Sequence, residues 1–147
     1  MIMKLTKDFE LEEMVRSTTA RERGIDNTPS EKVKDNLRML CEEVLQPLRD
    51  RWGAPIVVSS GYRCPQLNRA VGGVRNSDHL YGCAADIHAL GDKPEDNERL
   101  FRLAVSMMKE GTLRNVKQII DEYHYNWIHI SRQDGRTPKR CQVVHIK

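Results

Sequence analysis

The feature that most constrains the fold is a pair of segments, SDHLYGCAADI at residues 77–87 and WIHIS at residues 127–131. The first segment carries His79 and Asp86, and the second carries His129. Two imidazoles and one carboxylate make a three-ligand zinc site with a fourth position open for water, which is the arrangement of a hydrolytic zinc centre. Such ligands meet only through folding, so the fold has to bring the two segments together.

The length of the chain predicts a single domain over residues 1–147, because this length buries one core but not two. The aromatic content of 5% indicates a mainly aliphatic core. The 24 Lys and Arg against 21 Asp and Glu give a net charge of only +3, and the basic residues are scattered between acids. This distribution argues against nucleic acid as a partner, and we expect a monomer.

The cysteines and the start of the chain bear on the compartment. Cys41, Cys64, Cys83 and Cys141 form no CxxC pair, which predicts free thiols in a reducing compartment. The start, MIMKLTKD, reaches charged residues too early for a secretory signal, and no later segment is apolar enough to span a bilayer. We therefore expect synthesis in the cytoplasm without a signal peptide, and no membrane partner.

Helical patterns occupy much of the first half of the chain. Apolar residues at helical spacing within residues 5–21 predict a short helix followed by a loop. A longer helix is predicted to begin after Ser30, a suitable N-cap, and to end at the WGAP sequence of residues 52–55. Further helices are predicted at residues 64–71 and around Pro94.

Five segments have the composition or the alternation of β-strands. They are residues 56–60, 84–89, 116–123, 127–131 and 142–146. Helices come first and a hairpin last, which predicts an α+β fold with N-terminal helices packed on a small, mostly antiparallel sheet. Alternation places His129 on the strand face opposite Ile128 and Ile130, so the imidazole can point into a cleft while the isoleucines pack in the core.

Both metal-ligand segments resemble motifs of one known family. SDHLYGCAAD is similar to the SxHxxGxAxD signature of zinc D-Ala-D-Ala carboxypeptidases and related peptidoglycan peptidases, and WIHIS resembles their C-terminal WxHxS motif. SGYR at residues 60–63, the following LN and GG pairs, and the opening LEEMVRSTTARERGIDNTP resemble the smaller, often phage-encoded members. The resemblance covers most of residues 5–131 and implies the fold shared by DD-peptidases and hedgehog domains.

The resemblance also implies roles for individual residues. His79, Asp86 and His129 correspond to the family's Zn²⁺ ligands, and the ion would polarise the scissile carbonyl and lower the pKa of its bound water to about 7. Arg63 corresponds to the SGYR arginine, which is suited to hold a substrate carboxylate or the developing oxyanion; a structural salt bridge is the alternative. Ser77 would donate to the substrate or, equally, cap the loop backbone.

A peptidase of this type also needs a general base. Several relatives carry an acid three residues before the last histidine, where this chain has Asn126. Smaller members instead carry an acid at the end of the preceding strand, which indicates Glu122. A hairpin turn at residues 125–126 would place Glu122 directly across from His129 and Asp121 on the opposite face, so we prefer Glu122.

The expected function is a zinc metallopeptidase that hydrolyses an amide bond in the peptidoglycan stem peptide, as a carboxypeptidase or an endopeptidase. If the gene belongs to a phage, holin release would bring the protein to the cell wall. The alternative is a catalytically silent zinc-binding module of the same fold, which binds the wall or serves as a virion part, and Asn126 is the residue that favours it. His88 fits either a role behind Asp86 or that of an ordinary histidine, and Cys83 fits a small buried side chain.

Overall fold

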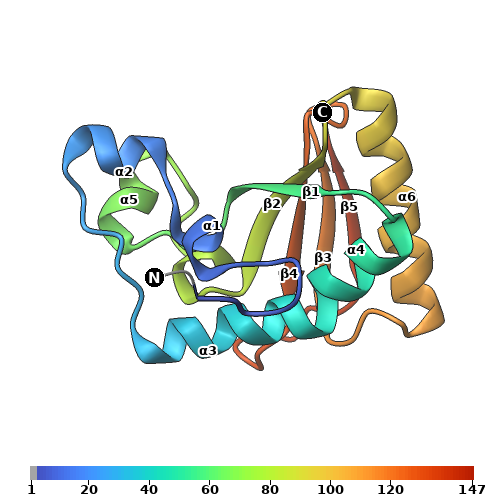
Figure 1. Ribbon diagram of the computed structural model, residues 1–147, viewed down its shortest axis with the longest axis horizontal. Coiled ribbons are helices and arrows are strands. Elements are labelled where there is room, and N and C mark those ends of the chain that lie inside the picture. Colours follow the sequence, from blue (N-terminus) through green and yellow to red (C-terminus); the bar gives the residue numbers. More distant parts are fainter. Residues whose placement is uncertain (1–2) are drawn as a thin grey trace.

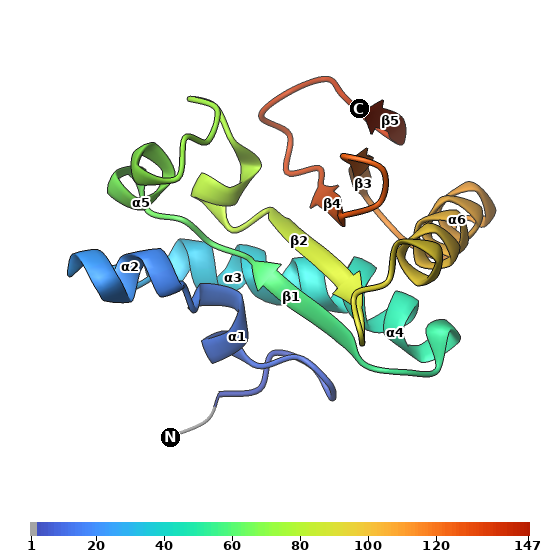
Figure 2. The same ribbon diagram turned by 90° about the horizontal axis from the view of Figure 1, so that it is seen from above.

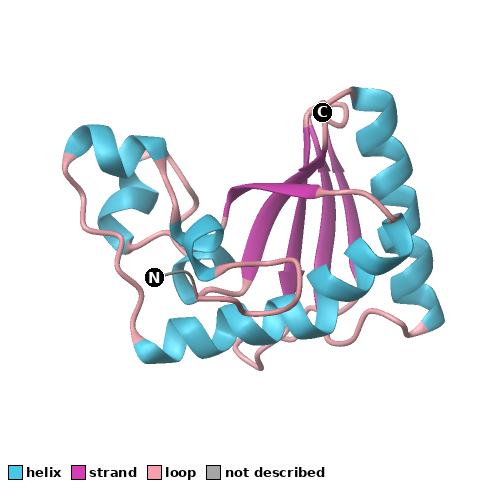
Figure 3. Ribbon diagram, viewed as in Figure 1, coloured by secondary structure: helices cyan, strands magenta, loops and turns pink. Residues whose placement is uncertain are grey.

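A computed structural model describes residues 3–147 and has an α+β architecture (Figures 1 and 3). The helical elements are α1 (Leu11–Val15), α2 (Thr18–Arg23), α3 (Glu31–Leu40), the π-helical η1 (Cys41–Leu45), α4 (Gln46–Trp52), α5 (Pro65–Ala70), the 3₁₀ turn η2 (Asp78–Tyr81) and α6 (Pro94–Glu110). The strands are β1 (Ile56–Ser60), β2 (Ala84–Ala89), β3 (Val116–Glu122), β4 (Trp127–Arg132) and β5 (Gln142–Ile146). Among these helices, none has both the length and the apolar character needed to cross a membrane.

The strands form one mixed sheet in the order β1-β2-β4-β3-β5. All neighbouring pairs are antiparallel except β3 and β5, which are parallel. The predicted α+β class and mostly antiparallel sheet are therefore confirmed. Figure 2 shows α6 lying along the β3 side of the sheet and α3 and α4 running beneath it.

The core lies between the sheet and these helices. Ile87, Ile119, Ile128 and Ile130 are fully buried on one face of the central strands. They pack in one cluster with Leu100 of α6 and with apolar residues of the helices before β1. Because strand side chains alternate, the residues between these isoleucines, including Asp86 and His129, face the other side of the sheet.

The long helical stretch predicted to begin after Ser30 is present, and its ends match the expectation. The Ser30 hydroxyl accepts from the Val33 amide at 3.2 Å, and Gly53 ends the stretch with a φ of 77°. Its middle is π-helical just before Pro47. A proline cannot bond to the carbonyl four residues earlier, and that carbonyl, from Glu43, accepts from the Arg114 amide at 3.1 Å instead.

The N-terminal segment differs from its prediction as a single short helix, because it forms two helices, α1 and α2. The chain is extended at Arg16, and the Ser17 hydroxyl accepts from the Ala20 amide at 3.1 Å, which starts α2. Asn27 fixes this corner through its side-chain amide, which donates to the Val15 carbonyl at 2.8 Å and to the Tyr62 carbonyl at 3.0 Å. The break thus links the N-terminal helices to the segment that follows β1.

Candidate metal centre

The structure brings together the three predicted metal ligands from separate elements. His79 lies in η2, Asp86 in β2 and His129 in β4, and one ligand atom from each lies within 4.8 Å of the others. Asp86 and His129 are paired across the β2–β4 ladder. Sheet pairing therefore positions two of the side chains, and the loop that leads into β2 supplies the third.

The spacing of these atoms suits a tetrahedral zinc ion. Asp86 Oδ1 lies 3.3 Å from His79 Nε2 and 3.2 Å from His129 Nδ1. Zinc bonds to nitrogen and oxygen are about 2.0–2.1 Å long, so two ligand atoms of a tetrahedral ion lie about 3.3 Å apart. The two contacts to Asp86 thus have the length of tetrahedron edges.

The protonation of His79 gives an independent reason to expect a cation. His79 Nδ1 lies 2.6 Å from the Gly61 carbonyl, and a carbonyl only accepts, so Nδ1 carries the hydrogen. Burial lowers the pKa of His79, which favours the neutral ring with a lone pair on Nε2. That lone pair points at a carboxylate oxygen, an arrangement that a metal ion between them would stabilise.

Asp86 is held ionised at this place. Burial opposes its charge, but the interactions with His79 and His129 outweigh burial and keep the pKa of Asp86 below its ordinary range. A neutral His79 imidazole beside an ionised Asp86 carboxylate matches the protonation states that a zinc ion requires of such ligands. The residues present therefore fit the metal.

The backbone before Arg63 supports the ligand His79 from behind. Besides the Gly61 contact, the Arg63 amide donates to the His79 carbonyl at 3.0 Å, and the Tyr62 amide donates to the Met14 carbonyl at 2.7 Å. A Cβ on Gly61 would lie only 2.2 Å from the Met14 carbonyl oxygen. The SGYR segment thus fits tightly between α1 and η2 and fixes the orientation of a ligand imidazole.

Arg63 faces the metal centre and has no ion-pair partner within 4.0 Å among residues 3–147. Its guanidinium donates to the Ser77 hydroxyl at 3.3 Å, and its Nε is buried without a hydrogen-bond partner in that part of the chain. Burial lowers the pKa of Arg63, whereas the charges of Asp86 and Glu122 raise it. The structural salt bridge that was the alternative role for Arg63 is therefore absent among residues 3–147. The Nε of its guanidinium is available to donate to an anion.

Ser77 takes the capping position that was the alternative to substrate binding. Its hydroxyl oxygen accepts from the His79 amide at 3.2 Å and from Arg63. The hydroxyl thereby joins the predicted clamp Arg63 to the ligand loop. A donor role toward substrate stays a prediction.

Glu122 lies on the face of the sheet that carries His129, but not directly across from it. Glu122 pairs with Trp127, and Ile120 lies opposite His129. The predicted direct pairing is wrong because the turn spans residues 123–126 instead of only 125–126. A shift of two positions preserves the face, so Glu122 becomes a diagonal neighbour of His129, at about 7–8 Å between backbones and within reach of a long side chain.

Electrostatics distinguish Glu122 from Asp121. Burial and then the charge of Asp86 raise the pKa of Glu122, as expected for a carboxylate close to the metal ligands. Asp121 faces the other side, where it accepts from the Tyr125 amide at 2.7 Å and pairs with His145 at 3.0 Å. Asp121 is therefore engaged in the hairpin, whereas Glu122 lies on the face that carries the metal ligands.

Two further predictions concern His88 and Cys83. His88 Nδ1 lies 2.8 Å from the Ala89 carbonyl and 3.6 Å from Asp92, at the end of β2 away from the ligands. This placement fits the ordinary histidine better than a role behind Asp86. Burial and then Asp134 raise the pKa of Cys83 to about 11, so little thiolate is present at neutral pH.

Sequence reasoning missed a buried ionic cluster next to His79. Asp78 Oδ1 accepts from Lys117 Nζ at 2.9 Å and from the Arg136 guanidinium at 2.8 Å, and Arg136 also stacks over the Tyr81 ring at 3.7 Å. The cluster ties the ligand loop to β3 and to the segment after β4. No local sequence pattern predicts this cluster, because its members come from three distant segments of the chain.

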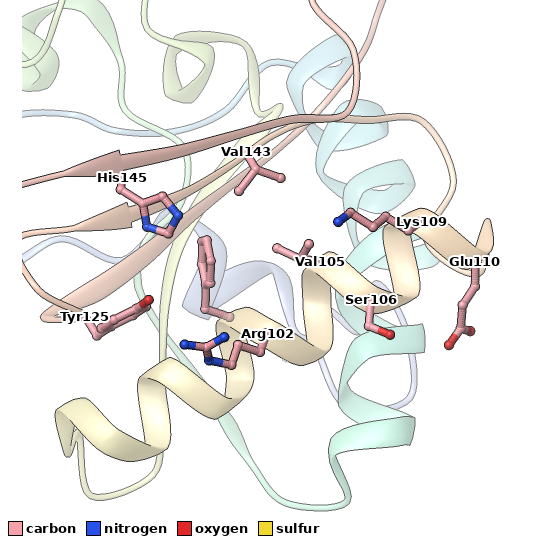
Figure 4. Close-up of a pocket in the computed structure, with 9 residues that line it drawn as sticks. Arg102, Val105, Ser106, Lys109, Glu110, Tyr125, Val143 and His145 are labelled. Carbon is pink, nitrogen blue, oxygen red and sulfur yellow. The ribbon is translucent and has the colours of Figure 1, made fainter.

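A large cavity lies away from this centre. It measures about 780 Å³ and is bounded by α6, the hairpin turn and β5, with Phe101, Val105, Tyr125, Val143 and His145 among its lining residues (Figure 4). It includes none of the predicted site residues. The metal-ligand chemistry, and not cavity size, therefore identifies the candidate site.

Comparison with known proteins agrees with this geometry. A search of curated proteins gives no match. The sequence profile of the family described as Peptidase M15 matches residues 7–131, a span that includes His79, Asp86 and His129. The chain belongs to the Peptidase M15 family, a family of zinc-dependent metallopeptidases.

Proposed function

We propose that this protein is a zinc metallopeptidase that hydrolyses an amide bond in the stem peptide of peptidoglycan. The observation that carries the proposal is the triangle of ligand atoms from His79, Asp86 and His129, in which both contacts to Asp86 have tetrahedral spacing, in a chain of the Peptidase M15 family. Arg63 and Glu122 border this triangle on the same side of the sheet. These groups are the set that a hydrolytic metal centre requires.

Each residue has a distinct task in the proposed reaction. A zinc ion held by the three ligands would supply Lewis-acid activation of water and of the scissile carbonyl. Glu122 takes a proton from the attacking water and returns it to the leaving amine. Its raised pKa is closer to neutral pH than the pKa of an ordinary glutamate, which suits a general base. Arg63 donates to the substrate carboxylate or to the oxygen on which negative charge develops.

A silent zinc-binding module of the same fold is the second candidate. The observation that favours it is Asn126 at the position where several relatives carry an acid. Asn126 closes the hairpin turn, because its backbone amide donates to the Glu122 carbonyl at 3.1 Å. Under this alternative the protein binds the cell wall or a virion partner and cleaves nothing.

Mass analysis of purified muropeptides incubated with the zinc-loaded protein tests the proposal. We expect release of D-Ala or of stem fragments, and the masses identify the bond. Glu122→Gln should lower the rate by about 10²–10⁴-fold while zinc stays bound, because it removes proton transfer but not a metal ligand. Glu98→Gln, a change on α6 away from the metal centre, is the matched control and should keep the wild-type rate.

The two candidates give opposite results in this assay. A zinc-loaded wild-type protein that leaves every muropeptide intact would contradict the peptidase. If the same protein binds isolated cell walls, the silent module is supported. Activity that disappears in Glu122→Gln excludes the silent module.

A further inference from the structure

A smaller pocket of about 270 Å³ lies beside the metal centre. Its walls come from the α1–α2 corner, the end of β1 and α5, and its lining includes Arg16, Ser17, Ser60, Tyr62 and Arg63. Ser60 is the β1 partner of the ligand Asp86. Arg63 belongs both to this pocket and to the metal centre. A substrate bound at the metal can therefore extend directly into this pocket.

The pocket is positively charged and lacks an acid of its own. Its lining holds Arg16 and Arg63 and no carboxylate. Within residues 3–147, neither arginine has an ion-pair partner within 4.0 Å. Guanidinium groups bind carboxylates through two parallel hydrogen bonds, so two guanidinium groups without an ion-pair partner beside one pocket favour an anionic occupant.

The corner that carries Arg16 is held rigidly. α1 ends as the chain becomes extended at Arg16, and Ser17 caps the next helix. Asn27 connects this corner to the opposite wall, because its side-chain amide bonds both the Val15 carbonyl and the Tyr62 carbonyl. The backbone that carries Arg16 is therefore fixed before any ligand binds, so binding has to order only its exposed side chain.

We propose that this pocket is a carboxylate-binding subsite and that Arg16 is its specificity-determining residue. The inference rests on the proposed peptidase function and names the part of the substrate that the site selects. A stem peptide has free carboxylates at its C terminus and on its glutamyl residue, and both offer the same chemistry. Capture of the C-terminal carboxylate makes the enzyme a carboxypeptidase, whereas capture of the glutamyl carboxylate makes it an endopeptidase.

Three synthetic substrates distinguish these sources: the stem pentapeptide, its C-terminal amide and its glutamyl α-amide. The wild-type kcat/KM should fall for the one amide that replaces the bound carboxylate. Arg16→Ala should lower kcat/KM for the pentapeptide by about tenfold to a hundredfold, the range of a charge-assisted hydrogen bond. It should cause no further loss with the sensitive amide, and Arg16→Lys should restore part of the rate.

Arg21→Ala is the matched control, because Arg21 is an exposed arginine of α2 that does not line the pocket. Equal losses in Arg16→Ala on all three substrates, or no loss on any, would overturn the subsite. If the wild type cleaves none of them, the peptidase fails, and calorimetry still tests the subsite with the same uncleaved peptides. The pentapeptide should then bind more tightly than one amide, and an unchanged difference in Arg16→Ala would refute the inference.

Discussion

Gly61 shows how a single position in this chain serves both packing and chemistry. Its missing side chain lets the chain approach the Met14 carbonyl, and its own carbonyl accepts from the ligand His79 at 2.6 Å. The sequence identifies Gly61 only as part of the SGYR motif. The structure gives the physical reason for glycine, which is the lack of space and not an unusual backbone angle.

We expect Gly61→Ala to lower the free energy of unfolding by about 1–3 kcal/mol, the usual cost of forcing an extra group into a packed site. It should also weaken zinc binding, because the carbonyl that orients His79 has to move. Denaturant unfolding and zinc titration measure the two effects. Gly53→Ala is the control, since Gly53 has a φ of +77° and open space around it. It should cost stability of about 1–2 kcal/mol through backbone strain without changing zinc affinity. Unchanged zinc affinity in Gly61→Ala would contradict the proposed support of His79.

The charge of Arg63 gives a signed prediction for the pH dependence. A general base works only when ionised, so kcat/KM should rise with pH through the pKa of Glu122, which burial and then Asp86 raise above 4.5. Arg63 opposes this shift by stabilising the ionised form. In Arg63→Gln the acid limb of the kcat/KM profile should therefore move to higher pH, in addition to any loss of rate. A limb that stays in place or moves to lower pH would show that Glu122 is not the titrating base.

At the level of elements, the hairpin between β3 and β4 decides where Glu122 lies. Three consecutive residues of its turn, Tyr123, His124 and Tyr125, have positive φ values although none is glycine. The turn is held from outside, by Asp121 and by the side-chain amide of Asn97 on α6, which donates to the Tyr125 carbonyl at 2.9 Å. Tertiary contacts, and not local turn chemistry, set the register.

This origin explains which part of the hairpin could be predicted from sequence. Strand alternation depends only on neighbouring residues, so the prediction that His129 and Glu122 share one face of the sheet is correct. The turn length depends on Asn97, which is distant in sequence, so the prediction that the two residues pair directly is wrong. The helix break at Arg16 and the parallel pairing of β5 were missed for the same reason, because Asn27 and the β3 edge determine them through long-range contacts.

Asn97→Ala tests the external support of the hairpin. Asn97 is fully buried, and its side chain also accepts from the Ala89 amide at 2.8 Å. Its removal leaves buried backbone groups unpaired at a cost of about 1–3 kcal/mol each, so urea unfolding should show a clear loss of stability. Glu95→Gln, at an exposed position in the first turn of the same helix, should cost only about 0.3–1 kcal/mol, because it removes just an interaction with the helix dipole. Wild-type stability in Asn97→Ala would mean that the turn holds its own shape.

At the level of the whole molecule, the candidate metal centre joins the loop that carries η2 to two central strands of the sheet. η2 follows α5 in a lobe beside the sheet, whereas β2 and β4 are central strands (Figures 1 and 2). A metal ion bound to His79, Asp86 and His129 would link the lobe to the sheet. Zinc binding and folding should therefore be coupled, because the three ligands come together only in the folded state.

This coupling predicts that zinc raises the midpoint of thermal unfolding in proportion to the logarithm of its free concentration. At a free zinc concentration a hundredfold above Kd, the gain in free energy of unfolding should be about 2.7 kcal/mol. His129→Ala should abolish most of the gain, and a chelator should return the wild type to the midpoint of the metal-free protein. His124→Ala removes an exposed imidazole from the hairpin turn and should keep the full zinc-dependent shift. The comparison of the two variants separates binding at this centre from loose binding to surface histidines, because only the former is lost with His129. An equal zinc-dependent shift in His129→Ala and the wild type would remove His129 from the site, and with it the coupling of the lobe to β4.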